Sequence, residues 1–146
     1  MPQVARWKLR PEVREKVFDI LVDSVAKVNN KNTARTFAEF LLTPTEKIMI
    51  AKRITAALLL ASGANYDQIH QAVHVSTATI ARIKNKYKYN EEFKKLIDQI
   101  LKDRMLRKAF WEFTQSVAKS ALRVKPNVFW QGVALYTEKK LDSEIL

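Results

Sequence analysis

The sequence predicts an all-α protein. Its 146 residues include only two Gly and four Pro, which leaves little material for the tight turns that connect β-strands. Apolar residues recur at three- and four-residue spacing along most of the chain, which is the period of an amphipathic helix. Hydrophobic residues make up 47% of the chain, well above the content of a disordered chain. We therefore expect helices around a real core, in one domain or in the protomer of a compact dimer.

The first two helices are expected between residues 11 and 42. The preceding ten residues form a polar, basic tail that we expect to fray in solvent. Pro11 suits the first turn of a helix, and the helical spacing of apolar residues continues from Val13 to Val28. A second helix is expected from Thr33 to Leu42. Its apolar side would carry Phe37, Phe40 and Leu41.

The third helix is expected to open at Thr43 and to end at Gly63, a C-terminal cap. Thr43 is an N-cap residue, Pro44 occupies the first turn, and Glu46 completes a capping box. Residues 48–61 are apolar on almost every side of the helix, which indicates burial on several faces. In a chain of this size, such a helix suggests the centre of a dimer, where a partner covers what the chain itself cannot.

Residues 65–87 are expected to form a helix-turn-helix, in which two short helices meet at a tight turn. The first helix begins at Asn65 or Tyr66, the turn lies at residues 74–76, and the second helix runs over residues 77–86. Apolar side chains from both helices and from the turn are spaced so that they meet in one miniature core. These core residues are Ile69, Val73, Val75, Ile80 and Ile83.

Polar residues mark the start of both short helices. Asn65 with Gln68, and Ser76 with Thr79, supply side-chain oxygens that can cap the free N–H groups. His74 stands in the turn, where a left-handed residue is common, and it tolerates that conformation better than a β-branched residue. A second histidine precedes it by four residues, but no carboxylate or thiol stands at a matching position, so we expect no metal site.

A helix-turn-helix places its second helix in a groove of double-stranded DNA, and the outward residues here are small or polar. Thr77, Ala78 and Thr79 are expected to meet base edges, and Arg82 a guanine edge or a phosphate. The full set of expected DNA contacts is Gln68, Gln71, Ser76, Thr77, Ala78, Thr79, Arg82, Lys84, Lys86 and Lys88. An ordinary helical hairpin has the same periodicity, but a net charge of +11 favours a polyanionic partner.

The run LLTPTEK, the AKR that precedes an apolar helix, and the ATIARI of the helix-turn-helix resemble the Trp repressor family. The resemblance covers roughly residues 40–88. It implies an intertwined helical homodimer that presents two helix-turn-helix heads to a palindromic operator. The fold class is therefore expected to be an intertwined all-α dimer core with a helix-turn-helix, plus a C-terminal helical hairpin.

The resemblance also implies a possible ligand pocket. Thr43, Arg53 and Arg82 stand at positions that the family uses to bind tryptophan. Where the family has a glycine that leaves room for the indole ring, this chain has Ile83. Where the family has a serine near the ligand's amino group, this chain has Lys86. A β-branched side chain fills the space of the ring and a cation disfavours an ammonium group, so tryptophan is not expected as an effector.

Beyond residue 89 the resemblance ends, and we expect a Trp-repressor-like domain over residues 1–89 and a helical extension over residues 90–146. A helix capped by Asn90 should continue toward Lys125, unbroken or with a break near residues 105–108. A last amphipathic helix over residues 128–136 would complete a hairpin. We expect the aromatic side chains of this hairpin to pack on each other or on a partner. They are Phe110, Trp111, Phe113, Phe129, Trp130 and Tyr136.

The basic residues of the extension form either a solvated face or an extended DNA-binding surface. They are Lys102, Arg104, Arg107, Lys108, Lys119, Arg123 and Lys125.

Several classes of function are not expected. Cysteine is absent, so there are no disulfides or thiolate metal sites, and a reducing cytoplasm fits. The N-terminal residues lack the apolar stretch of a signal peptide. Residues 48–61 are too short to cross a bilayer, which takes about 20 residues. There is no glycine-rich phosphate loop and no nucleophile with a plausible His-and-acid set, so we expect neither catalysis nor a cofactor.

The sequence thus favours a sequence-specific DNA-binding regulator, most simply a repressor, that acts as a homodimer. The alternative is an architectural or assembly protein without sequence preference, which binds nucleic acid by charge and recruits a partner through its C-terminal helices.

Overall fold

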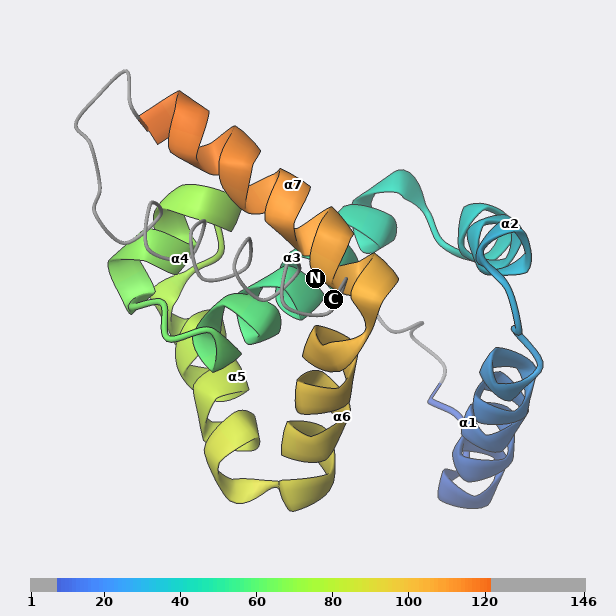
Figure 1. Ribbon diagram of the computed structural model, residues 1–146. Coiled ribbons are helices and arrows are strands. Elements are labelled where there is room, and N and C mark those ends of the chain that lie inside the picture. Colours follow the sequence, from blue (N-terminus) through green and yellow to red (C-terminus); the bar gives the residue numbers. More distant parts are fainter. Residues whose placement is uncertain (1–7, 122–146) are drawn as a thin grey trace. The chain divides into compact units, whose positions relative to one another are not determined.

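The computed structural model describes residues 8–121, with side chains as far as residue 117. Every element in this range is an α-helix, which confirms the all-α fold class (Figure 1). The helices are α1 (Pro11–Ala26), α2 (Lys31–Leu41), α3 (Pro44–Ala61), α4 (Tyr66–Val73), α5 (Thr77–Tyr89), α6 (Glu91–Lys102) and α7 (Arg104–Ala121). Among these residues, no helix is long and apolar enough to cross a membrane. The helix expected over residues 128–136, with its aromatic residues, lies outside the described range.

The chain divides into two compact units, residues 1–51 and residues 52–146, and α3 contributes to both. The domain boundary expected after residue 89 rests on resemblance and not on packing, and it stays a prediction.

The first unit has no core of its own among its described residues. No residue between 8 and 51 is buried, although α1 and α2 carry many large apolar side chains. The helices themselves are well defined by local chemistry: Pro11 opens α1, and the Asn30 side chain accepts a hydrogen bond of 2.9 Å from the Thr33 N–H. Asn30 is therefore the N-cap of α2, and the helix begins two residues before the expected start.

The expected capping box opens α3. The Thr43 N–H and the Thr43 hydroxyl both donate to Glu46 Oε2, at 2.8 and 2.7 Å, and the Glu46 N–H donates to Thr43 Oγ1 at 3.3 Å. These hydrogen bonds to the charged carboxylate, first from the Thr43 N–H and then from its hydroxyl, lower the pKa of Glu46. The local sequence is sufficient to explain where this helix starts.

The other end of α3 is closed by Gly63, as expected. Its φ of 91° lies in the left-handed region, the Gly63 N–H donates to the Leu60 carbonyl at 3.0 Å, and the Ala64 N–H donates to the Leu59 carbonyl at 2.9 Å. This pair of bonds is a Schellman motif, which satisfies carbonyl groups that the helix leaves without partners.

The second unit holds the core. Residues 56–59 of α3 are buried, and they pack with side chains from α4 to α7. α5 and α6 run side by side in opposite directions from the turn at Asn90, and α7 crosses the unit (Figure 1). Asn90 caps α6 as expected, since its side chain accepts from the Phe93 N–H at 2.9 Å. On α7, Phe110 is buried and stacks on Phe113, with ring centroids 6.3 Å apart.

The helix expected beyond residue 90 is broken, and the break lies at Asp103. The Asp103 side chain accepts a hydrogen bond of 3.0 Å from the Leu106 N–H, so Asp103 is the N-cap of α7. The break therefore lies just before residues 105–108, near which the sequence allowed either an unbroken helix or a break. Arg107, one of the basic residues expected on a solvated or DNA-binding face, is buried with 4% of its surface exposed, and that expectation is wrong for this residue.

The Schellman motif predicts a specific cost for a side chain at position 63. A Cβ at Gly63 would meet nothing within 4 Å, so Gly63→Ala introduces no clash. Its only cost is the strain of an alanine in a left-handed backbone conformation. Gly63→Ala should lower the free energy of unfolding by about 1–2 kcal/mol. Gly63→Asn should cost less, because Asn visits positive φ more readily. Chemical denaturation measures both, and equal losses would contradict the backbone explanation.

Candidate nucleic-acid interface

The helix-turn-helix is present as expected, and we call residues 65–89, with α4, the turn and α5, the head. All of the apolar side chains that the sequence assigned to its miniature core are buried, and two of them, Ile69 and Ile80, are completely buried. Ile69 comes from α4 and Ile80 from α5, so their burial in one cluster fixes the two helices against each other. Val75 brings the turn into the same cluster.

Both expected caps of the head are confirmed. Asn65 Oδ1 accepts from the Gln68 N–H at 2.9 Å, and Gln68 Oε1 accepts from the Asn65 N–H at 2.8 Å. At the start of α5, Ser76 Oγ accepts from the Thr79 N–H at 3.3 Å. Gln68 is 9% exposed, and its amide is held in this capping box. The structure therefore gives Gln68 a capping role and not the outward position expected for a DNA contact.

The turn is held by two histidines. His74 is left-handed, with φ and ψ both 51°, and its N–H donates to the His70 carbonyl at 2.8 Å. His70 Nδ1 lies 2.9 Å from the Val75 carbonyl oxygen. A carbonyl only accepts, so His70 donates from Nδ1. The sequence did not indicate this bond, which ties α4 to the first residue after His74.

α5 presents most of the rest of the expected DNA-binding surface, together with Gln71 of α4 and Ser76 of the turn. It runs to Tyr89, almost one turn beyond the expected end, and Asn90 follows as its C-cap. The side chains at its N-terminal end are exposed except that of Thr79, which is half-buried. Exposed expected contacts are Gln71, Ser76, Thr77, Ala78, Arg82, Lys84, Lys86 and Lys88.

The cations of α5 do not share one face. With 3.6 residues per turn, Arg82 and Lys86 are separated by about 40° around the helix axis, whereas Arg82 and Lys84 are separated by about 160°. Lys84 and Lys88 line a cavity together with Tyr66 of α4. The outward surface thus has two parts: one around Arg82 and Lys86, and one around Lys84.

The residues of the possible ligand pocket have these surroundings. The hydroxyl of Thr43 is engaged with Glu46, and Arg53 and Arg82 are exposed. Ile83, which stands at the family's glycine position, is buried in the core of the head. The pocket implied by the resemblance stays a prediction.

The fold and the head define the class of this protein: an all-α protein with a helix-turn-helix. Comparison with known families identifies it further. The family model described as Trp repressor protein matches residues 16–101, more than half of the chain. The chain therefore belongs to the Trp repressor family, whose members are DNA-binding helix-turn-helix regulators.

The chain is also similar to a curated protein over most of that protein's length. "Uncharacterized protein YerC" of Bacillus subtilis (strain 168) is 29% identical over 90 residues, which is 61% of this chain and 86% of that protein. No solved structure matches the chain. The family match extends through α6 to its last residue but one, although the resemblance in the sequence was expected to end at residue 89. α7 follows the matched residues.

The buried pair that joins the two helices of the head predicts a large effect on stability. Ile80→Ala should lower the free energy of unfolding by about 2–5 kcal/mol, since it leaves a cavity at a completely buried site. Leu106→Ala, at a site 46% exposed, is the matched control and should cost much less. Denaturant titration followed by circular dichroism measures both. Similar losses for the two variants would show that the head is not held by this core.

Proposed function

We propose that this protein is a homodimeric repressor that recognises a specific DNA sequence through the head. The observation that carries the proposal is the position of the α5 N-terminus. A buried core holds α5 in place, while Thr77 and Ala78 stay exposed at the end that enters the groove in this motif. Small side chains allow close approach to the DNA, and a threonine hydroxyl can bond a base edge or a phosphate.

The charge of the head supports DNA as the partner. Between residues 64 and 90 the only acidic residue is Asp67, against one Arg and three Lys. Arg82 and Lys86 lie on the same side of α5 as Ala78. Arg82 is about 40° around the helix axis from Ala78, and Lys86 is about 40° further on. Arg82 is thus suited to a guanine edge or a phosphate, and Lys86 to a phosphate.

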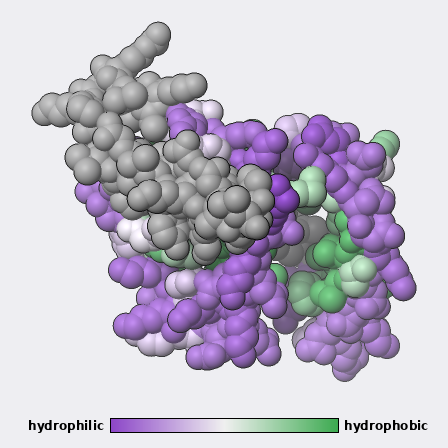
Figure 2. Space-filling view, viewed as in Figure 1, coloured by the Kyte–Doolittle hydropathy of each residue, from purple (hydrophilic) through white to green (hydrophobic). Residues whose placement is uncertain are grey.

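The homodimer is proposed because the first unit cannot bury its own apolar surface. α1 carries Val17, Leu21 and Val25 at four-residue spacing, and each is close to half exposed or more. Figure 2 shows hydrophobic surface on one side of α1 and hydrophilic surface on the other. Isolated proteins rarely expose patches of this kind. The exposed large apolar side chains of the unit are Leu9, Val17, Phe18, Ile20, Leu21, Val22, Val25, Phe40, Leu41, Ile48 and Ile50.

A second copy of the chain supplies a matching apolar surface in equal amount, and a two-fold pair also provides two heads. Two recognition helices about 34 Å apart read half-sites one turn of DNA apart. Repression is the simplest consequence, because occupation of the site alone blocks access to it.

The alternative function, an architectural protein that binds nucleic acid by charge, is favoured by α7. This helix lies beyond the family match and exposes Met105 and Leu106, an apolar surface that a partner could cover. Competition separates the two functions. If random duplex displaces the protein from its genomic targets as well as a selected duplex does, the architectural function is correct and the repressor proposal is wrong.

The head predicts which substitutions affect recognition. With a duplex selected from a random pool, Arg82→Ala and Thr79→Ala should each weaken binding by about 1–3 kcal/mol and reduce discrimination against scrambled duplex. Arg35→Ala removes the same charge from an exposed site on α2 and should leave discrimination intact. Fluorescence anisotropy measures the affinities. Unchanged discrimination in both head variants would contradict the proposed reading of bases by α5.

Salt provides a second test of the same interface. Neutralising several phosphates releases counterions, so affinity should fall steeply between about 50 and 200 mM salt. Binding that does not weaken over this range would contradict the electrostatic part of the proposal.

The dimer has its own test. Leu21→Asp places a charge in the middle of the apolar side of α1 and should shift the protein from dimer to monomer in analytical ultracentrifugation. Lys16→Asp introduces the same side chain on the polar side of the helix and should leave the dimer intact. If both variants sediment as dimers, α1 is not part of the interface.

A further inference from the structure

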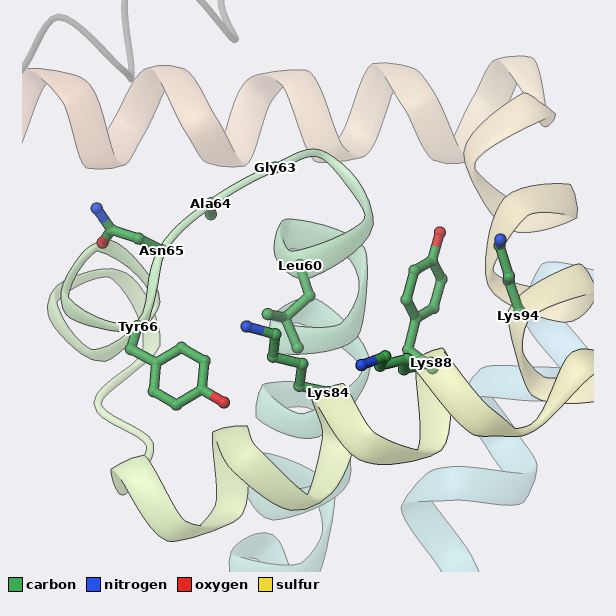
Figure 3. A pocket seen from close by; sticks show the side chains of 9 residues that line it. Leu60, Gly63, Ala64, Asn65, Tyr66, Lys84, Lys88 and Lys94 are labelled. Carbon is green, nitrogen blue, oxygen red and sulfur yellow. The ribbon is translucent and has the colours of Figure 1, made fainter.

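A cavity of about 480 Å³ opens on the second unit beside α5. Its walls come from the end of α3, the start of α4, α5 and α6. Figure 3 shows Lys84 and Lys88 extending from α5, with Tyr66 on one side and Lys94 of α6 on the other. The volume lies within the range of about 300–1,000 Å³ that is usual for small-molecule sites. It is large enough for one small organic ligand.

The cavity is strongly basic. Lys84, Lys88 and Lys94 line it, and no Asp or Glu does. Within the described part of the chain, none of these three ammonium groups forms an ion pair with a carboxylate. Three cations around one cavity raise the local concentration of anions. They suit a group that carries close to two negative charges better than a single carboxylate.

Aromatic rings hold two of the ammonium groups at the cavity. Lys84 Nζ lies 5.2 Å from the centroid of the Tyr66 ring, and Lys94 Nζ lies 5.9 Å from that of Tyr87. The Tyr87 hydroxyl donates to Asp98 at 3.0 Å, which fixes the ring. Burial, and then the bond to Asp98, raises the pKa of Tyr87, so the phenol stays neutral. A cation–π contact at an exposed site contributes about 0.5–1 kcal/mol, less than the roughly 1.5–3 kcal/mol of a hydrogen bond to a charged group. The ammonium groups can therefore leave the rings for an anion.

The cavity also has an apolar wall. Leu60 of α3 is half-buried, and so is the ring of Tyr66. A ligand body held between these side chains would leave its charged end toward the lysines of α5 and α6. A purely inorganic anion would use only one part of the cavity.

We propose that this cavity binds a small phosphate monoester that carries a planar or apolar group. A phosphate monoester has a charge of about −1.5 to −2 at neutral pH, which matches the lysines, and its body matches the apolar wall. Lys84 lies about 160° around α5 from Arg82. The cavity thus lies on the other side of α5 from Arg82, although Lys84 and Lys88 are also among the expected DNA contacts. The proposed ligand site does not depend on the proposed repressor function.

Titration of the full chain with adenosine 5′-monophosphate tests the proposal by calorimetry, with inorganic phosphate and adenosine as parallel probes. The monophosphate should bind at least tenfold more tightly than either probe. Lys94→Ala should weaken its binding about tenfold, as should Lys84→Ala. Lys95→Ala is the matched control, because it removes the same charge from the next residue of α6 and Lys95 does not line the cavity; its affinity should be unchanged.

Three results would overturn the proposal. The first is equal binding of inorganic phosphate and the monophosphate, which leaves a site for anions alone. The second is equal weakening by Lys94→Ala and Lys95→Ala, which indicates unspecific attraction to a basic surface. The third is that Lys84→Ala and Lys94→Ala leave the monophosphate unaffected but weaken duplex DNA uniformly, which makes these lysines contacts to the DNA backbone. Far-ultraviolet circular dichroism verifies that each variant is folded.

Discussion

The contact between α4 and α5 through Ile69 and Ile80 is the constraint on which the rest of the head depends. Both side chains are completely buried, and they belong to the same cluster of buried apolar side chains. Each helix is short, and helices of this length are marginal in water on their own. Burial of the shared core therefore both stabilises the helices and fixes the rotation of α5 about its axis. That rotation decides that Ala78 and Arg82 face outward.

The first unit follows the opposite logic. Local chemistry specifies α1 and α2 well, with Pro11 and Asn30 at their starts, but no side chain between residues 8 and 51 is buried. Helix propensity and capping are each small contributions, and most helical stability in proteins comes from packing an apolar face. The caps of this unit define where its helices start, but without a core they do not make the helices stable. The missing stability has to come from outside the unit, which is why the second copy is central to the proposed function.

The features that could be predicted from the sequence are those that depend on residues three or four positions apart. The capping boxes at Thr43 and Asn65, the left-handed His74 and the core of the head are all of this kind. Asp103 had the same local signal, an N-cap residue, but the continuous apolar spacing around it made the break ambiguous. The burial of Arg107 and the cavity beside Lys84 arise from contacts between helices distant in the chain. A single sequence does not carry that information in its periodicity.

The two parts of α5 make the proposed ligand and DNA sensitive to each other. A bound phosphate monoester would neutralise about two of the positive charges beside the helix that enters the DNA. Charges on one helix lie within or close to the Debye length, about 8 Å at physiological salt, so neutralising some of them weakens the attraction of the head for phosphates. Linkage then requires DNA to weaken the binding of the ligand by the same factor. A ligand that instead strengthens DNA binding must do so by ordering the head, since α3, α4, α5 and α6 all contribute walls to the cavity. The sign of the coupling therefore separates an effect of charge from an effect of conformation, because charge alone acts in only one direction.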